Sequence, residues 1–152
     1  MDMQQPGIMN DKKIDLTITT PRGVKFVEKA DRVIMRCIDG DMGVLPGHAR
    51  VSTVLGDGIL RILNNGIEKK LAVFGGIAEI DDKSVKIFST IAQRPEEIDR
   101  ERAERDRQEA ETAIREESEE VRIHSLQAML RRSLVRIEVS LHIDEDEYTE
   151  EL

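Results

Sequence analysis

The sequence is poor in the residues that build stacking surfaces and disulfide frameworks. Its 152 residues include no tryptophan, one tyrosine and three phenylalanines, so aromatic residues make up 3% of the chain. RNA-binding sheets need exposed rings on which bases stack, and that class is therefore not expected here. The one cysteine, Cys37, lies in an apolar run. This excludes a disulfide framework and predicts a buried, inert thiol in a reducing compartment.

Long hydrophobic runs are also missing. No apolar stretch approaches the roughly 20 residues that a membrane-spanning helix needs. Residues 1–11 lack the basic and apolar regions of a secretory signal. We therefore expect a soluble, intracellular chain without direct membrane insertion. If it works at a membrane, other chains must hold it there.

The residue types that carry catalysis and metal binding occur without suitable spacing. The histidines, His48, His124 and His142, are scattered, and none has a second ligand at the spacing of a metal site. The sequence contains no nucleophile elbow, no cysteine–histidine pair and no evident acid–base pair of carboxylates. These observations predict a non-catalytic chain with no metal and no required cofactor. They leave a small hydrolase as the least favoured class.

The charge of the chain changes along its length. The net charge is −8, but residues 1–94 carry 14 basic and 12 acidic residues, whereas residues 95–143 carry 9 and 13. The tail from 144 to 152 carries no base and 6 acids. This break predicts a β domain at 12–93, a helical hairpin at 95–143 and an acidic tail. No part is strongly basic, so nucleic acid is not an expected partner.

The first part has the pattern of short strands joined by tight turns. Residues 13–19 alternate apolar and polar side chains, as a half-buried strand does. Further apolar segments follow about every 8–12 residues, which is typical of an antiparallel sandwich or barrel. Turns are expected at residues 21–23, 56–58, 64–66 and 81–84. The pair Gly75-Gly76 predicts a bulge or a close approach of two backbones.

The second part has the pattern of two helices. Pro95 and the two glutamates after it favour a helix start, and the charged segment that follows runs to about Glu117 with a thin, alanine-rich apolar stripe. Ser118 is the expected N-cap of a second helix. The apolar positions of that helix form a stripe close to a heptad seam: Ile123, Leu126, Leu130, Leu134, Ile137 and Leu141. Residues 135–143 also alternate in the period of a strand, but the longer stripe favours a helix.

Residues 38–49 are the most distinctive stretch of the chain. Three glycines and one proline fall among them, so we expect a stiff loop that is neither regular strand nor helix. Its apolar side chains, Met42, Val44 and Leu45, either tuck under the loop or face a partner. An ordinary connection between two strands is the alternative interpretation.

This stretch also carries a resemblance. Residues 40–49 read GDMGVLPGHA, which resembles the G-[ED]-x-G-x-[LY]-P-G-H-A signature of the epsilon subunit of bacterial F-type ATP synthase. The later Phe74-Gly75-Gly76 is similar to that family's second glycine pair, and the resemblance covers roughly residues 13–141. It implies an N-terminal antiparallel β-sandwich followed by a C-terminal α-helical hairpin, an α+β fold.

The family resemblance implies a role for the loop in a rotor. The sandwich would dock on the gamma subunit and on the ring of c subunits, at the cytoplasmic face of the bacterial plasma membrane. Asp41 and His48 would lie against the polar loops of the c-ring. Met42, Val44 and Leu45 would help to form the contact surface. The chain would then be a non-catalytic subunit that couples gamma to the c-ring during ATP synthesis driven by protons or sodium ions, a choice that the sequence leaves open.

For the hairpin the resemblance implies regulation. In this family the helices extend along gamma and inhibit ATP hydrolysis, or fold back on the sandwich, and some members bind ATP there. Residues 98–103 read IDRERA, which fits the I/L-D-x-x-R-A motif of those members. The implied ATP-binding residues are Asp99, Arg102, Ala103, Arg132 and Arg136. Gln93 and Glu109 stand where such members have Glu and Arg. An i,i+3 pair and cap contact between Asp99 and Arg102 is the alternative.

The arginines of the second helix suggest a further contact. Arg131, Arg132 and Arg136 would grip an acidic segment of the catalytic beta subunit when the hairpin extends, and the acidic tail would repel that segment. A different class also fits the pattern: an unrelated β-sandwich adaptor whose coiled-coil arm dimerises through residues 123–141.

Overall fold

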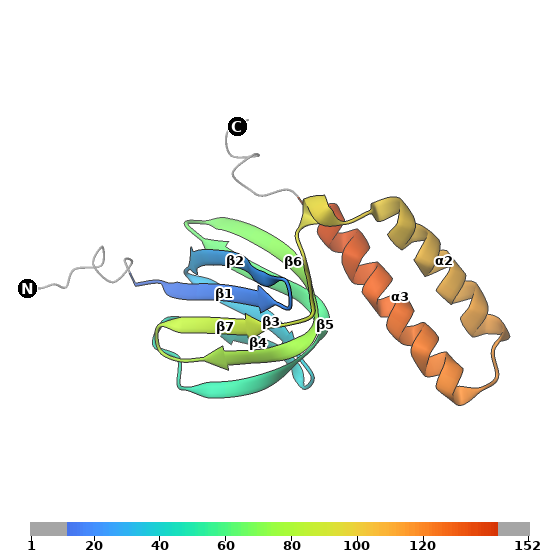
Figure 1. The fold of residues 1–152 in the computed structure, drawn as a ribbon, viewed down its shortest axis with the longest axis horizontal. Coiled ribbons are helices and arrows are strands. Elements are labelled where there is room, and N and C mark those ends of the chain that lie inside the picture. The colour runs from blue at the N-terminus through green and yellow to red at the C-terminus, as the bar shows by residue number, and fades with distance from the viewer. Residues whose placement is uncertain (1–11, 143–152) are drawn as a thin grey trace, which may run out of the picture.

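The computed structural model describes residues 12–142, which form a folded sheet with a helical hairpin beside it (Figure 1). The predicted fold class, a β-sandwich followed by two helices, is confirmed. The acidic tail at 144–152 lies outside the described residues.

Eight strands build the sandwich. Their bounds are β1 Ile14–Thr20, β2 Gly23–Ala30, β3 Arg32–Cys37, β4 Gly40–Val44, β5 Val51–Asn64, β6 Ile67–Ile80, β7 Ser84–Phe88 and β8 Ile91–Gln93. They are hydrogen-bonded in the order β2-β1-β7-β6-β5-β3-β4, and β8 pairs with β6. The pair β1–β7 is parallel, and the other pairs of described strands are antiparallel.

The core between the layers is aliphatic, as the low aromatic content requires. Its fully buried side chains include Leu16, Ile18, Val85 and Ile87, which meet across the parallel pair β1–β7. Phe26 on β2 is the one aromatic ring in this cluster. Cys37 lies in the same cluster and is 5% exposed, so the predicted burial of the thiol is confirmed.

One of the turns expected from glycines is absent. Residues 56–58 lie inside β5, which runs without a break for 14 residues, so the predicted turn there is wrong. The glycines serve close approach instead. A Cβ on Gly58 would lie 2.5 Å from the Cβ of Arg36 on β3.

Gly75 and Gly76 lie inside β6, which also has 14 residues. The β5–β6 pairing keeps one register on both sides of them, so they do not form a bulge. The other predicted role, a close approach of two backbones, applies. Gly76 has a φ of +115°, and a Cβ there would lie 2.2 Å from the carbonyl oxygen of Phe88.

The hairpin turn between β5 and β6 is confirmed at Asn65 and Gly66. Their φ angles of 54° and 79° are those that a two-residue turn between right-twisted strands requires. The carboxylate of Asp31 accepts a hydrogen bond from the backbone N–H of Asn65 at 2.8 Å. Hydrogen bonds from the Lys13 ammonium and from this N–H hold the pKa of Asp31 below its ordinary value.

The first helix starts later than the sequence suggested. Pro95–Glu97 form a single 3₁₀ turn, η1, and Ile98 is extended, so α2 spans Arg100–Glu116. Asp99 is its N-cap, because its carboxylate accepts a hydrogen bond from the backbone N–H of Arg102 at 3.1 Å. This cap contact is the one that the sequence offered as the alternative to a ligand role.

The second helix, α3, spans Glu120–Ser140, so the helical interpretation of this segment is confirmed over the strand interpretation. Ser118 is not its N-cap. Glu119 holds that position without a side-chain cap, and the Glu117 carboxylate accepts from the backbone N–H groups of Ser118 and Glu119. The Glu117 side chain thus orders the turn that leads into α3, and the helix starts without a side-chain cap.

The two helices meet through small side chains. Ala103 and Ala110 of α2 are buried, as is Ser133 of α3, whose hydroxyl donates to the carbonyl of Met129 at 2.8 Å. Of the expected apolar stripe, Leu134 and Leu141 point away from this contact and are 48% and 57% exposed. The sheet covers another part of α3, where Val135 and Val139 lie against β6.

Candidate functional site

The candidate site lies where α3 packs beside the sheet, against β5 and β6 (Figure 1). Ala72 and Phe74 of β6 form a second small core with Val139 of α3. Partly buried apolar side chains surround it: Ile59, Ile91, Ile98 and Val135. The hairpin is therefore docked on its own sandwich through a cluster separate from the main core.

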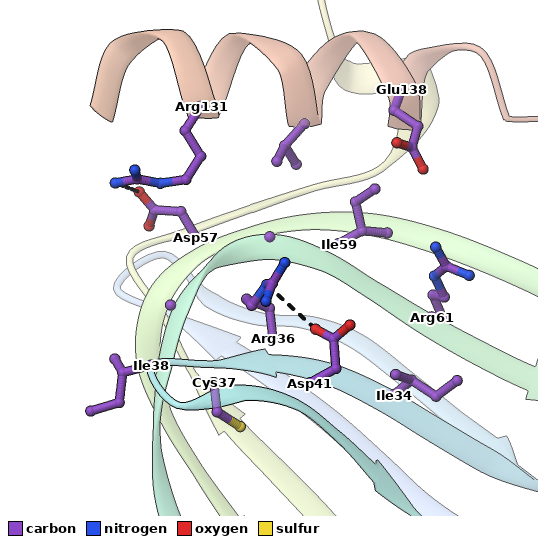
Figure 2. A pocket seen from close by; sticks show the side chains of 13 residues that line it. Ile34, Arg36, Cys37, Ile38, Asp41, Asp57, Ile59, Arg61, Arg131 and Glu138 are labelled. Atoms are coloured by element: carbon purple, nitrogen blue, oxygen red, sulfur yellow. Dashed lines mark ion pairs between the residues drawn. The ribbon is translucent and has the colours of Figure 1, made fainter. Parts of the chain in front are cut away.

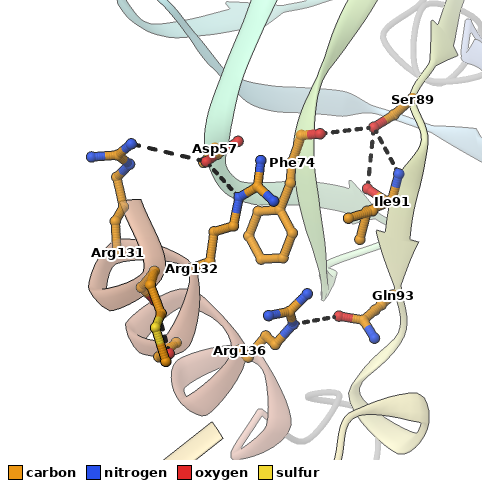
Figure 3. A network of polar contacts seen from close by, with 10 residues as sticks. Asp57, Phe74, Ser89, Ile91, Gln93, Arg131, Arg132 and Arg136 are labelled. Carbon is orange, nitrogen blue, oxygen red and sulfur yellow. Dashed lines mark hydrogen bonds and ion pairs between the residues drawn. The ribbon is translucent and has the colours of Figure 1, made fainter. Parts of the chain in front are cut away.

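Two arginines of α3 cover the ring of Phe74. The guanidinium carbons of Arg132 and Arg136 lie 5.2 and 4.7 Å from the ring centroid (Figure 3). These distances are within the range of cation–π attraction. The ring is 3% exposed, so both cations sit against a desolvated surface.

Each arginine also has a polar partner on the sandwich (Figure 3). Arg132 donates from Nε to a carboxylate oxygen of Asp57 at 2.9 Å, and Arg136 donates from Nε to Oε1 of Gln93 at 2.8 Å. Arg131 is the third cation here, with Nη2 at 4.0 Å from the same Asp57 oxygen. Three guanidinium groups thus share one carboxylate and one amide.

The electrostatics of the cluster show that the arginines are close to one another. Burial lowers the pKa of Arg136, and the positive charge of Arg132 lowers it further. The charge of Arg102 on α2 adds to this effect, whereas Asp106 opposes it. Asp57 opposes it as well, so the three guanidinium groups of Arg102, Arg132 and Arg136 face two carboxylates here. The one positive charge left over favours an added anion.

The structure separates the five residues that the resemblance assigned to ATP. It brings Arg102, Arg132 and Arg136 into one region. Asp99 is engaged as a helix cap, and Ala103 is 2% exposed, so its methyl group serves the contact between the helices. Two further residues of the cluster, Asp57 and Phe74, were not predicted as members of this site. The sequence feature that could have pointed to Phe74 is its position directly before Gly75-Gly76.

The residues predicted for a rotor interface have three different environments. Leu45 is 58% exposed, and Met42 is partly buried against the core. Asp41 pairs with Arg36 at 3.4 Å on the surface of the β3–β4 hairpin. His48 lies beyond the end of β4, where the neighbouring Gly47 donates to the Asp82 carbonyl at 2.8 Å.

Two expectations for this stretch are corrected. Gly40–Val44 form strand β4, paired with β3 over five residues, so the stretch is not wholly irregular. Val44 is fully buried in the main core, because alternation along β4 turns it inward. Its side chain is therefore not accessible to a partner and instead anchors the loop to the core.

A groove of about 570 Å³ opens between α3 and strands β3, β4 and β5 (Figure 2). Arg131 and Glu138 reach into it from the helix, and Arg36, Asp41 and Arg61 line it from the sheet (Figure 2). Acids and bases are mixed along it, so the groove itself selects for no single charge. Among residues 12–142, no group of His, Cys, Asp and Glu is arranged to hold a metal ion. None of the described helices is long and apolar enough to cross a membrane.

Comparison with protein families accounts for both parts of the chain. Residues 13–95 match the β-sandwich domain of the ATP synthase delta/epsilon chain, and residues 96–140 match its long α-helix domain. The chain belongs to the ATP synthase delta/epsilon chain family. The resemblance seen in residues 40–49 is thereby confirmed.

Individual members of the delta/epsilon family support the epsilon assignment. The ATP synthase epsilon chain of Desulforamulus reducens is 34% identical over 125 residues, covering 82% of this chain and 95% of that protein. The epsilon chain of Herpetosiphon aurantiacus is 35% identical over 127 residues, covering 84% and 93%. A chain of Euglena gracilis mitochondrial ATP synthase, solved with OSCP, F1 and the c-ring, aligns with a TM-score of 0.72 and 30% identity. That alignment covers 86% of this chain and 82% of the other.

Proposed function

We propose that this chain is a non-catalytic subunit of the central stalk of an F-type ATP synthase, where it couples gamma to the c-ring during ion-driven ATP synthesis. The observation that carries the proposal is the family match across both the sandwich and the hairpin. The chain would then be peripheral to the membrane, at the cytoplasmic face of a bacterial plasma membrane. The adaptor with a dimerising arm lacks comparable support.

The contact with the c-ring would come from the exposed residues of the predicted interface. Leu45 is the exposed apolar side chain, and Asp41 and His48 supply the polar edge. Val44 holds this edge in place from the core. A rigid turn is suited to carrying torque because it does not deform between the two partners.

The hairpin would inhibit ATP hydrolysis when it leaves the sandwich. In the folded arrangement Arg131, Arg132 and Arg136 all face the sandwich, two of them in direct hydrogen bonds. An acidic segment of the catalytic beta subunit would have to compete with these contacts, although the Arg131 and Arg132 side chains are 56% and 41% exposed. We infer that the folded hairpin is the non-inhibitory state and the extended hairpin the inhibitory one.

Removal of residues 95–152 tests this role in the assembled enzyme. We expect ATP hydrolysis to rise about fivefold or more, because the inhibitory arm is absent and couplings of this kind fall in that range. The steady-state rate of hydrolysis is measured beside enzyme assembled with the full chain. Co-purification of the shortened chain with gamma is the control that it has been incorporated. An unchanged rate with the shortened chain in place would refute inhibition by the hairpin.

We also propose ATP as a regulatory ligand of the folded hairpin. The observation that favours it is the gathering of Arg102, Arg132 and Arg136 in one region with excess positive charge. Guanidinium groups form the paired, charge-assisted hydrogen bonds that phosphate oxygens accept. A nucleotide held there would stabilise the folded state through both helices.

Isothermal titration of ATP into the full chain tests this ligand. We expect a dissociation constant of about 1 mM or tighter, and at least about a tenfold weakening in Arg136→Ala because one charge-assisted contact is lost. Arg115→Ala is the matched control, since Arg115 is an exposed arginine at the far end of α2. No heat at millimolar ATP, or equal weakening in both variants, would contradict the proposal.

A further inference from the structure

Asp57 is in an unusual position among the charged residues of the sandwich. It lies in the middle of β5, yet its carboxylate faces α3, 75 residues later in the chain. Its side chain is 12% exposed, the least of any carboxylate in the ion pairs between described residues. The Arg132 side chain is 41% exposed, so water reaches this pair from the arginine side but not from the side of the carboxylate.

The other polar contacts between residues 95–142 and the sandwich are uncharged or have a more exposed carboxylate. Lys25 of β2 pairs with Glu97 of η1, whose side chain is 36% exposed. Gln93 accepts from Arg136 as a neutral amide. Glu138 of α3 pairs with Lys70 of β6 at 3.4 Å, but the Glu138 side chain is 53% exposed. Exposed pairs of this kind contribute little. Asp57 is thus the least exposed of the carboxylates that join the described parts of the two domains, at 12% against 36% for Glu97 and 53% for Glu138.

The carboxylate also lies where an anionic ligand would have to bind. It accepts the Nε–H of Arg132 and faces Arg131, while the Arg132 guanidinium rests on Phe74 (Figure 3). A phosphate that reached the same guanidinium would compete with Asp57 for its donors, because carboxylate and phosphate use the same fork of N–H groups.

We propose that Asp57 is an internal latch: its carboxylate takes the place of a ligand anion on Arg132 and keeps the hairpin folded when no nucleotide is bound. The regulatory meaning of the latch rests on the proposed role of the hairpin, but the latch itself is a property of the free chain. The folded state then requires no nucleotide, and ATP binds only by displacing Asp57 from Arg132. Loss of Asp57 loosens the hairpin and at the same time raises the affinity for ATP.

Hydrogen exchange of the full chain, followed by mass spectrometry without nucleotide, tests the latch. In Asp57→Asn we expect the amides of α3 to exchange about tenfold faster, since a charge-assisted hydrogen bond is replaced by a neutral one. Exchange in β1 and β7, which lie away from the hairpin, should not change. Glu138→Gln is the matched control, because it removes a carboxylate that joins the same two parts at the surface, and its effect should stay within about twofold.

A second variant keeps the test independent of any effect on β5. Arg132→Gln should accelerate exchange in α3 at least as much, because it also removes the cation–π contact with Phe74. Adding Asp57→Asn to it should change little, because the contact between the two residues is already lost. Unchanged exchange in Asp57→Asn, faster exchange in β1 and β7 as well, or additive effects of the two changes would each overturn the latch.

Adding ATP completes the test. At 1 mM ATP, a concentration near the affinity expected of the site, we expect α3 to regain more protection in Asp57→Asn than in the natural chain. Equal responses of the two chains would overturn the competition between Asp57 and the nucleotide. The experiment uses the free chain, so the latch can fail while the hairpin still inhibits the assembled enzyme, and inhibition can fail while the latch holds.

Discussion

Replacing Gly76 with alanine is expected to remove about 3–5 kcal/mol from the free energy of unfolding of the sandwich. Two causes act together. The φ of +115° is one that residues with a Cβ rarely adopt, and the new methyl carbon would lie 2.2 Å from the carbonyl oxygen of Phe88. That oxygen belongs to the backbone of β7, so relief of the clash requires movement of a strand that lies between β1 and β6. Urea unfolding followed by circular dichroism measures the loss.

Two other glycines separate these causes. Gly66 has a φ of +79° with nothing within 4 Å of a built Cβ, so Gly66→Ala should cost only the backbone strain, about 1 kcal/mol. Gly43 has an ordinary φ and the same open surroundings, so Gly43→Ala should change stability by less than about 0.5 kcal/mol. If the Gly76 and Gly66 variants lost the same free energy, the close approach of β6 to β7 would not be the reason for the glycine.

These glycines also show where the sequence was informative and where it was not. Local chemistry predicted the turn at Asn65-Gly66, because its positive φ angles are required by neighbours in the chain. Gly58 and Gly76 are required by strands distant in sequence, β3 and β7. In the sequence alone, nothing distinguishes a glycine that a local turn requires from one that a distant strand requires. Residues 56–58 were therefore predicted as a turn, although they continue a strand.

The helical hairpin was also predicted only in part. The spacing of apolar residues predicted two helices with a turn near Glu117, and the structure has them. The sequence did not reveal which face of α3 would be covered. Periodicity favoured a seam that included Leu134 and Leu141, whereas the sheet selects Val135 and Val139 together with two arginines. A hydrophobic pattern counts an arginine as polar even when its guanidinium group packs on a buried ring, so the pattern did not place these two arginines on the covered face.

The candidate site was predictable only through the family resemblance. That resemblance pointed to Arg132 and Arg136, which the structure does bring together, but it gave no reason to consider Asp57. The aspartate is surrounded by glycines in sequence, so its local pattern is that of a turn. Its partner is 75 residues away, and only the docking of α3 brings the two together.

Replacing Phe74 with alanine is expected to release the hairpin while the sandwich stays folded. The ring belongs to the small cluster under α3 and not to the main core, so the loss of about 3–5 kcal/mol falls on the docking of the helices. The two cation–π contacts are lost with it. We expect the amides of α3 to lose most of their protection against hydrogen exchange, because most of the stability of a helix in a protein comes from the packing of its apolar face. Strands β1 and β7 should keep theirs.

Phe26→Ala is the control for this experiment. Phe26 is as buried as Phe74, at 2% against 3% exposure, but it lies in the main core. Its loss should lower the stability of the sandwich itself, and the hairpin should lose protection together with the strands. If both variants unfolded the whole chain in one transition, the hairpin and the sandwich would form a single cooperative unit. The proposed inhibition of hydrolysis by an extended hairpin requires the opposite, a docking surface whose energy is separate from that of the core.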